Sequence, residues 1–156
     1  MRSLDELNAA DKNVLVRVDF NSPVDPATGR ILDDKRIRGH LDTVRRLANE
    51  GAVVVLLSHQ SRPGRADFTT LETHAERLSR VLGRRVEYVD SVFGDGVDEA
   101  VESAEPGDVL LLENARFYSE EYIEMPPEEA ADTHEVRRLA PLFDAYVNDA
   151  FSAALR

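Results

Sequence analysis

The sequence predicts an α/β protein in which a mainly parallel sheet lies between two layers of helices. Short apolar runs rich in β-branched residues alternate, along the 156 residues, with longer segments whose apolar residues recur at helical spacing. Two of the runs, residues 52–57 and 109–112, are continuously apolar, as in parallel strands that are buried on both faces. Four of them end abruptly in charged or amide side chains. Together these features predict a three-layer α/β/α sandwich with a mainly parallel, Rossmann-like sheet.

Five runs have the length and the β-branched content of strands. The second, Val53–Leu57, is the most uniformly apolar. Turn-forming residues at 22–30 follow the first run, and residues 31–32 are expected to return briefly as extended chain. The expected strands cover residues 13–19, 52–57, 86–89, 109–113 and 143–147.

Four intervening segments carry apolar residues at helical spacing. In the first, Ile37, Leu41 and Val44 share one face, and in the second, Thr69 and Glu72 have the spacing of a capping box. The expected helices cover residues 36–50, 69–82, 94–104 and 128–140. Three histidines fall within these helices and are expected to be solvated: His40, His74 and His134.

Composition limits the classes of protein to consider. A chain of 156 residues with 42% hydrophobic and 31% charged residues fits one soluble globular domain. The chain has no cysteine, which excludes disulfides and thiolate chemistry. Its net charge of −11 disfavours nucleic acid and anionic membranes as partners, and its apolar runs are too short to span a bilayer. We therefore expect a cytoplasmic, monomeric protein.

Basic side chains collect where the expected strands end. Because the carboxyl ends of parallel strands meet at one edge of a sheet, we expect these side chains to share one site. An arginine guanidinium is a planar fork suited to carboxylate or phosphate. Two interpretations stay open: the cations form an anion site, or they pair with Asp19, Glu113 and Asp149 and hold loops together. The cations concerned are Arg36, His59, Arg62, Arg116 and Arg156, whereas Arg65 is expected to be solvated.

Asp19 and Asn21 follow the first expected strand, and three roles are open to them. Asp19 would serve as a nucleophile in a phosphatase that forms an aspartyl phosphate, but such enzymes need a second acid where Asn21 stands. Asp19 would also suit a metal, although no companion cluster of ligands supports that role. Asp19 and Asn21 are best suited to bind a substrate hydroxyl group, which needs only an acceptor and an amide. No phosphate-binding loop of the Gly-x-x-x-x-Gly-Lys type is present.

Four blocks of the sequence resemble, in order and spacing, the signature blocks of the phosphoglycerate kinase family. The resemblance covers the amino-terminal part of that family, under half of a complete chain. The blocks are Val16-Arg-Val-Asp-Phe-Asn-Ser-Pro23, Leu57-Ser-His-Gln-Ser-Arg-Pro63, Leu111-Leu-Glu-Asn-Ala-Arg-Phe117 and Val147-Asn-Asp-Ala-Phe-Ser-Ala-Ala-Leu-Arg156.

The resemblance implies a protein of two domains that bind different ligands. In that family the amino-terminal domain binds 3-phosphoglycerate and the carboxy-terminal domain binds Mg-ADP or Mg-ATP. Hinge closure then allows reversible phosphoryl transfer between ATP and 3-phosphoglycerate, which gives 1,3-bisphosphoglycerate and ADP in glycolysis. The resemblance implies that residues 1–156 are an incomplete amino-terminal, substrate-binding domain, without the nucleotide-binding domain. Such a chain is expected to bind no cofactor or metal and to be inactive alone.

The resemblance also assigns roles to individual residues. Asp19 and Asn21 resemble the pair that holds the glycerate end of the substrate. Arg36 resembles the catalytic arginine that reaches the substrate carboxylate and stabilises the transferred phosphoryl group. The residues that resemble the basic cluster around the substrate phosphate are His59, Arg62, Arg116 and Arg156.

Two positions depart from the family pattern. Ser61 stands where the family usually has glycine, so the loop must adopt a conformation that serine tolerates. Leu155 stands where histidine usually precedes the final arginine, which removes one basic group. A binding-only module for a small phosphorylated carboxylic acid remains the alternative to the kinase.

Overall fold

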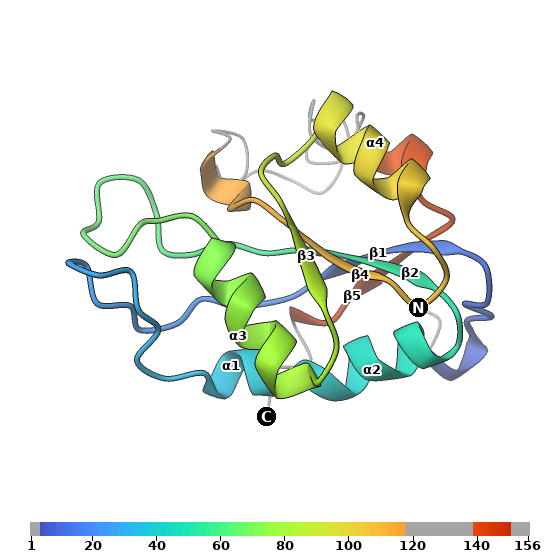
Figure 1. Ribbon diagram of the computed structural model, residues 1–156, viewed down its shortest axis with the longest axis horizontal. Coiled ribbons are helices and arrows are strands. Elements are labelled where there is room, and N and C mark those ends of the chain that lie inside the picture. Colours follow the sequence, from blue (N-terminus) through green and yellow to red (C-terminus); the bar gives the residue numbers. More distant parts are fainter. Residues whose placement is uncertain (1–3, 118–138, 151–156) are drawn as a thin grey trace.

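The computed structural model describes residues 4–117 and 139–150, and its centre is one parallel sheet (Figure 1). The strands lie in the order β3-β4-β2-β1-β5, and each neighbouring pair is parallel. The predicted α/β fold class is therefore confirmed. The strands are β1 (Asn13–Arg17), β2 (Val53–Leu57), β3 (Val86–Val89), β4 (Val109–Leu112) and β5 (Ala145–Asn148).

Helices cover both faces of the sheet, as the sandwich requires. One face packs against α1 (Lys35–Arg38), α2 (Leu41–Asn49) and α3 (Glu72–Leu82), and the other against α4 (Asp95–Ser103) (Figure 1). Alternate residues of β2 enter the two cores, so that Val54 joins one apolar cluster and Val55 the other. This two-sided burial explains why the strand sequence does not alternate between polar and apolar residues.

The expected helix over residues 36–50 is instead two helices separated by Gly39 and His40. The backbone N–H of His40 donates to Ile37 O at 3.1 Å, a tight i−3 bond that interrupts the regular helix. The capping box expected at Thr69 is also absent. Leu71 occupies the N-cap position of α3, and the backbone N–H of Glu72 donates to Thr70 Oγ1 at 3.3 Å.

Two of the three histidines expected at the surface are in fact fully buried. His40 and His74 are both 0% exposed. Both ring nitrogens of His40 are hydrogen-bonded inside the core, and so is Nε2 of His74. His134 and most of the expected helix 128–140 lie outside the described residues. At the end of that segment and just beyond it, Ala140–Leu142 form a short 3-10 helix. The expected extended pair at residues 31–32 is represented by an isolated bridge between Val24 and Ile31.

Among the described helices, none is both long enough and apolar enough to cross a membrane.

Candidate functional site

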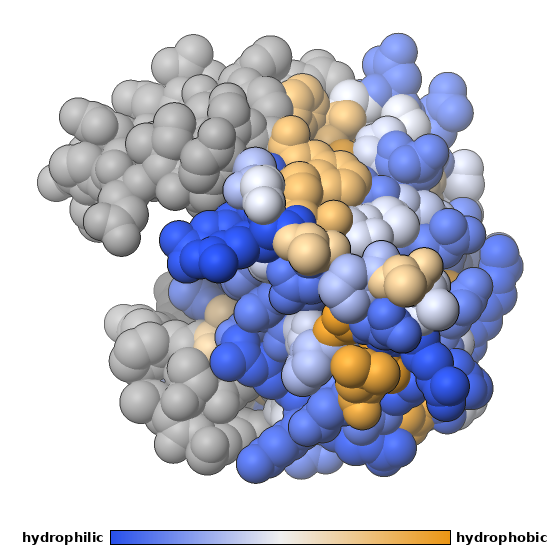
Figure 2. Space-filling view, turned by 90° about the vertical axis from the view of Figure 1, so that its left-hand side faces the viewer, coloured by the Kyte–Doolittle hydropathy of each residue, from blue (hydrophilic) through white to orange (hydrophobic). Residues whose placement is uncertain are grey.

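The four strands that end in polar residues are neighbours in the sheet. The order β4-β2-β1-β5 brings their carboxyl ends together at one edge, as the sequence predicts. Long loops leave this edge after β1 and β2 and extend to the left in Figure 1. Seen from that side, the surface is mostly hydrophilic, with small hydrophobic areas between the charged side chains (Figure 2). The edge therefore has the location and the polarity of a binding site.

Buried hydrogen bonds lock the loops after β1 and β2 to each other. Ser58 Oγ accepts the backbone N–H of Phe20 at 2.9 Å. Gln60 accepts the N–H of Ser22 at 3.0 Å and donates to its carbonyl at 2.8 Å, so its amide is held at both ends. Asn21 Oδ1 accepts the N–H of Ser61 at 2.8 Å. Because these hydrogen bonds join the two loops and both loops begin at strands of the sheet, their side chains are positioned before any ligand binds.

Asp19 and Arg36 form an ion pair on the open side of this edge. Asp19 Oδ2 accepts from Arg36 Nη1 at 2.8 Å, and Asp19 Oδ1 accepts the N–H of Asn21 at 3.1 Å. The Arg36 side chain remains 56% exposed. Exposed pairs of this kind contribute about 0–1 kcal/mol to stability, so the guanidinium is free to turn toward an anionic ligand at little cost.

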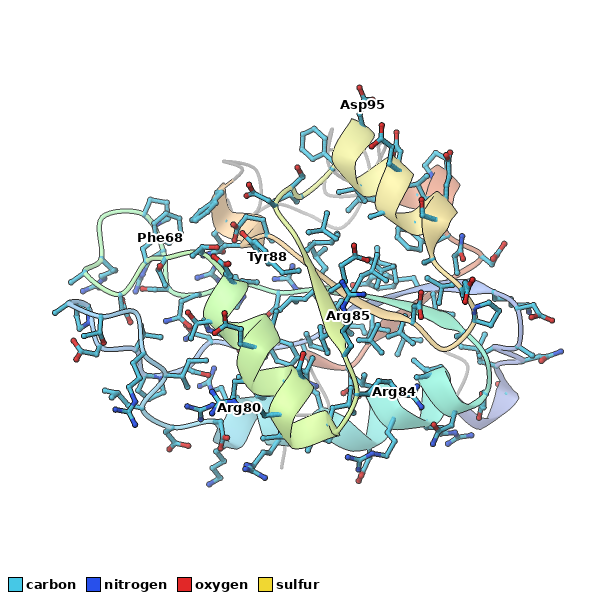
Figure 3. The ribbon with its side chains drawn as sticks, in the orientation of Figure 1. Phe68, Arg80, Arg84, Arg85, Tyr88 and Asp95 are labelled. Atoms are coloured by element: carbon cyan, nitrogen blue, oxygen red, sulfur yellow. The ribbon has the colours of Figure 1, made fainter. Side chains whose placement is uncertain are left out.

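The two other acids considered as arginine partners serve different groups. Glu113 accepts the N–H of Leu71 at 2.9 Å and a bond from Tyr88 Oη, which ties β4 to the start of α3 and to β3. Tyr88 lies on β3, near the start of α3 (Figure 3). Burial and this carboxylate raise the pKa of the Tyr88 hydroxyl. Asp149 binds the ring of His40. Both acids thus take part in hydrogen bonds that hold strands and helices together.

Arg116 is held rigidly beside the loop of residues 58–71 that follows β2, called the β2 loop below. Its Nη1 donates to Ser61 O at 3.0 Å, and its backbone N–H donates to Asn114 Oδ1 at 3.0 Å. Asn114, fully buried, donates in turn to Gln60 O at 3.0 Å and to Thr69 O at 2.8 Å. The short 3-10 helix Ala115–Phe117 therefore presents this guanidinium in a fixed place.

His59 lies partly buried among several of these cations. Burial and the charges of Arg116 and Arg17 lower the pKa of His59 to about 4, although Asp19 opposes the shift. The imidazole is therefore neutral at pH 7, and the positive charge of the site comes from its arginines. A bound phosphate would reverse the local repulsion and favour the protonated ring.

The sequence pointed to most of this site but missed Arg17, the last residue of β1. The available signal was an arginine between two apolar residues, Val16 and Val18, of the expected strand. Arg62 and Arg65 both lie exposed in the β2 loop, which agrees with the expected solvation of Arg65. The edge brings together Asp19, Asn21, Arg36, His59 and Arg116. Arg62 follows Ser61 in the same loop, whereas Arg156 and Leu155 lie outside the described residues.

Ser61 has a left-handed backbone, as its place in a glycine position suggested. Its φ is 57°, a conformation that costs a residue with a side chain about 1 kcal/mol. The hydroxyl donates to Asp67 Oδ1 at 2.6 Å. This charge-assisted bond offsets the strain and ties Ser61 to the far side of its own loop.

We expect the Ser61–Asp67 bond to appear as coupling in a double-mutant cycle. Asp67→Ala should lower the free energy of unfolding by about 1 kcal/mol in the original chain but by less than about 0.3 kcal/mol when Ser61→Gly is already present. Urea unfolding of the four proteins measures both values. Equal losses in the two backgrounds would show that the hydroxyl does not hold Asp67.

His74 supports the same loop from inside the core. Its Nε2 donates to Gln60 Oε1 at 3.0 Å, because the Gln60 amide nitrogen is already donating to Ser22 O. Its Nδ1 is buried and has no hydrogen-bond partner among the described residues. Burial lowers the pKa of His74 to about 4, so the ring is neutral in the folded chain at pH 7.

The low pKa values of His59 and His74 predict that stability falls between pH 7 and pH 4. Both lie near 4 in the folded state against an ordinary value of 6.5, so the unfolded chain binds more protons across this range. Each histidine contributes a slope of up to about 1.4 kcal/mol per pH unit. His74→Gln, which keeps the donor to Gln60, should make the dependence shallower in urea unfolding. The same slope for both proteins would contradict this assignment.

The donor chemistry of this edge does not fit a divalent metal. Its prominent groups are guanidinium cations, and residues 4–117 and 139–150 contain no cluster of three or more histidine or carboxylate side chains arranged to hold a metal ion. Guanidinium groups suit an anion that carries several oxygens. The fold and this edge define an α/β protein with an arginine-rich edge at the carboxyl ends of parallel strands.

Comparison with known proteins identifies the family. The sequence profile of phosphoglycerate kinase matches residues 4–156. The chain is 54% identical over 155 residues to phosphoglycerate kinase of Methanothermobacter thermautotrophicus and 52% identical over 154 residues to that of Methanobacterium bryantii. In both comparisons 99% of this chain is covered, and it spans 38% of the relative's length.

Solved structures agree with the sequence comparison. The crystal structure of phosphoglycerate kinase from Pyrococcus horikoshii OT3 superposes with a TM-score of 0.94 at 41% identity, over 100% of this chain and 38% of that one. Phosphoglycerate kinase from Coxiella burnetii matches with a TM-score of 0.72 at 31% identity, over 98% of this chain and 36% of that one. The chain belongs to the phosphoglycerate kinase family, which confirms the resemblance found in the four sequence blocks.

Proposed function

We propose that this chain binds 3-phosphoglycerate and forms the amino-terminal substrate domain, residues 1–156, of a phosphoglycerate kinase. The reaction is reversible phosphoryl transfer between ATP and the carboxylate of 3-phosphoglycerate, which gives 1,3-bisphosphoglycerate and ADP in glycolysis and gluconeogenesis. The observation that carries the proposal is the preformed cluster of arginines around the Ser58–Ser61 loop, beside Asp19 and Asn21.

The phosphate of the substrate would lie against the rigid part of the cluster. Arg116 is fixed by Ser61 O, so little conformational entropy is lost when its guanidinium binds phosphate oxygens. Arg62 is exposed in the adjoining loop and would close on the same group. His59, neutral before binding, would add a ring N–H or become protonated by the dianion. Arg156 is proposed for the same cluster on the strength of the sequence resemblance alone.

The glycerate end would lie toward the end of β1. Asn21 uses Oδ1 to hold Ser61 N–H, which leaves its amide hydrogens for a substrate oxygen, and Asp19 supplies an acceptor for the substrate hydroxyl. Arg36 would leave its exposed pair with Asp19 and reach the substrate carboxylate. A carboxylate is already nucleophilic at neutral pH, so the task of Arg36 is stabilisation of charge on the transferred phosphoryl group.

The Mg-nucleotide supplies the phosphoryl group when bound. We propose that Mg-ATP or Mg-ADP binds in the part of full-length relatives that this chain does not span, and that this chain alone binds substrate without turnover. We further propose a cytoplasmic, monomeric protein with no nucleic-acid or membrane partner.

Calorimetric titration of the 156-residue chain tests the proposal. We expect saturable binding of 3-phosphoglycerate and much weaker binding of two matched ligands, D-glycerate and inorganic phosphate, each of which fills half of the site. Equal affinity for 3-phosphoglycerate and inorganic phosphate would show that the site binds anions without specificity for 3-phosphoglycerate. Phosphorylation of 3-phosphoglycerate by this chain and Mg-ATP would overturn the assignment of the nucleotide site.

A further inference from the structure

His40 occupies the junction between α1 and α2 and points into the core. The ring is 0% exposed and packs edge-on against Phe20, with ring centroids 5.6 Å apart. Its Nε2 accepts the backbone N–H of Asp19 at 3.0 Å, and its Nδ1 lies 2.6 Å from Asp149 Oδ2. One side chain thus connects the ends of β1 and β5 to the helix junction.

These two contacts fix the tautomer of the ring. A backbone N–H only donates, so Nε2 of His40 must be unprotonated to accept from Asp19. The proton of the neutral ring therefore lies on Nδ1 and is donated to Asp149. The other oxygen of that carboxylate accepts from Thr43 Oγ1 at 3.1 Å, and the backbone N–H of Asp149 donates to Arg17 O at 2.8 Å. Asp149 is consequently held on three sides and gives the ring a firm anchor.

Asp19 links this anchor to the groups that are proposed to hold the glycerate end. Its backbone N–H is held by His40, and its carboxylate holds the N–H of Asn21 and the guanidinium of Arg36. Its neighbours Val18 and Phe20 are both 0% exposed, which leaves the Asp19 side chain directed outward. A shift of the Asp19 backbone would therefore move both groups that are proposed to hold the glycerate end.

We propose that His40 is a positioning residue: as a neutral Nδ1–H imidazole anchored on Asp149, it holds Asp19, and through Asp19 it sets Asn21 and Arg36 for substrate. The proposal rests on the proposed function. Among the described contacts, His40 reaches the substrate edge at the Asp19 backbone and the Phe20 ring, and not at a side chain proposed to bind substrate, so its effect is indirect.

The tautomer and the hydrogen bond are measurable without any substrate. In the 15N-labelled chain at pH 7, NMR should show a protonated Nδ1, an unprotonated Nε2 and a scalar coupling from the Asp19 amide nitrogen to His40 Nε2. A ring protonated on Nε2, or the absence of this coupling in a spectrum where other hydrogen-bond couplings are seen, would overturn the proposal. This result does not depend on whether 3-phosphoglycerate binds.

Two substitutions separate positioning from simple core packing. His40→Gln keeps an acceptor near the position of Nε2, whereas His40→Asn keeps a donor near the position of Nδ1. We expect His40→Asn to weaken 3-phosphoglycerate binding about tenfold or more and His40→Gln to weaken it less than about threefold. Val101→Ala, on the opposite face of the sheet, is the control that lowers stability without touching Asp19.

Dissociation constants from calorimetry and unfolding free energies from urea denaturation decide between the two roles. The proposal fails if His40→Asn binds 3-phosphoglycerate as tightly as the original chain does. It also fails if, in all three variants, the loss of binding free energy is the same fraction of the loss of unfolding free energy. If the original chain binds no 3-phosphoglycerate, the proposed function fails instead. The NMR signals of the Arg36 guanidinium then test positioning: they should change in His40→Asn and stay nearly unchanged in His40→Gln.

Discussion

Replacing Arg36 by alanine should lower kcat by about 10²–10³-fold when the change is made at the aligned arginine of a full-length phosphoglycerate kinase. The guanidinium is 56% exposed and pairs, within the described part of the chain, with Asp19 at 2.8 Å. It is therefore able to turn toward the reacting carboxylate at little cost. Because its charge is needed most in the transition state, kcat should fall more than KM changes.

Arg38 provides a matched control for Arg36. It lies two residues further along the same short helix, is 58% exposed and pairs with Asp34 at 2.9 Å. Arg38→Ala should leave kcat within about twofold of the original, since an exposed pair contributes little. Steady-state assays of both variants give the comparison. An unchanged kcat for the Arg36 variant would show that this arginine has no role in phosphoryl transfer.

Replacing Arg116 by alanine should raise the Kd for 3-phosphoglycerate by about 10- to 150-fold, the equivalent of one charge-assisted hydrogen bond. Its guanidinium is held at Ser61 O, and its charge helps to keep the pKa of His59 at about 4. The variant should therefore bind substrate weakly and also show a higher pKa for His59.

Two measurements on the 156-residue chain check this prediction: calorimetry for the Kd and NMR titration for His59. Arg65→Ala is the control, because Arg65 is an exposed arginine of the β2 loop with no proposed role. Its affinity for 3-phosphoglycerate should be close to that of the original chain. Similar losses for Arg65→Ala and Arg116→Ala would indicate attraction by net charge rather than a built phosphate site.

The fold could be predicted from sequence because each strand carries its own signal. Apolar residues predict all five strands, although only β2 and β4 are uninterrupted apolar runs, and the polar residues after four of the strands predict the candidate functional edge. The position of Ser61 also gave correct information, since a serine in a glycine position suggested an unusual backbone and φ is 57°.

Long-range partners could not be predicted in the same way. His40 fits a helical pattern, but its ring partner Asp149 is 109 positions away, and no local spacing reveals that contact. The break between α1 and α2 follows from the same contacts. The pairing of Arg36 with Asp19 shows a further limit of sequence-based prediction. An arginine that binds an anionic ligand and an arginine that forms an ion pair within the protein have the same sequence pattern.

The location of substrate binding tests the central claim most directly. We expect titration of the 15N-labelled chain with 3-phosphoglycerate to shift, saturably and with one dissociation constant, the amide signals of Asp19, Asn21, His59, Ser61 and Arg116. Signals from α4, on the opposite face of the sheet, should stay unchanged. No saturable shift, or shifts confined to residues away from the carboxyl ends of β1, β2 and β4, would contradict the account.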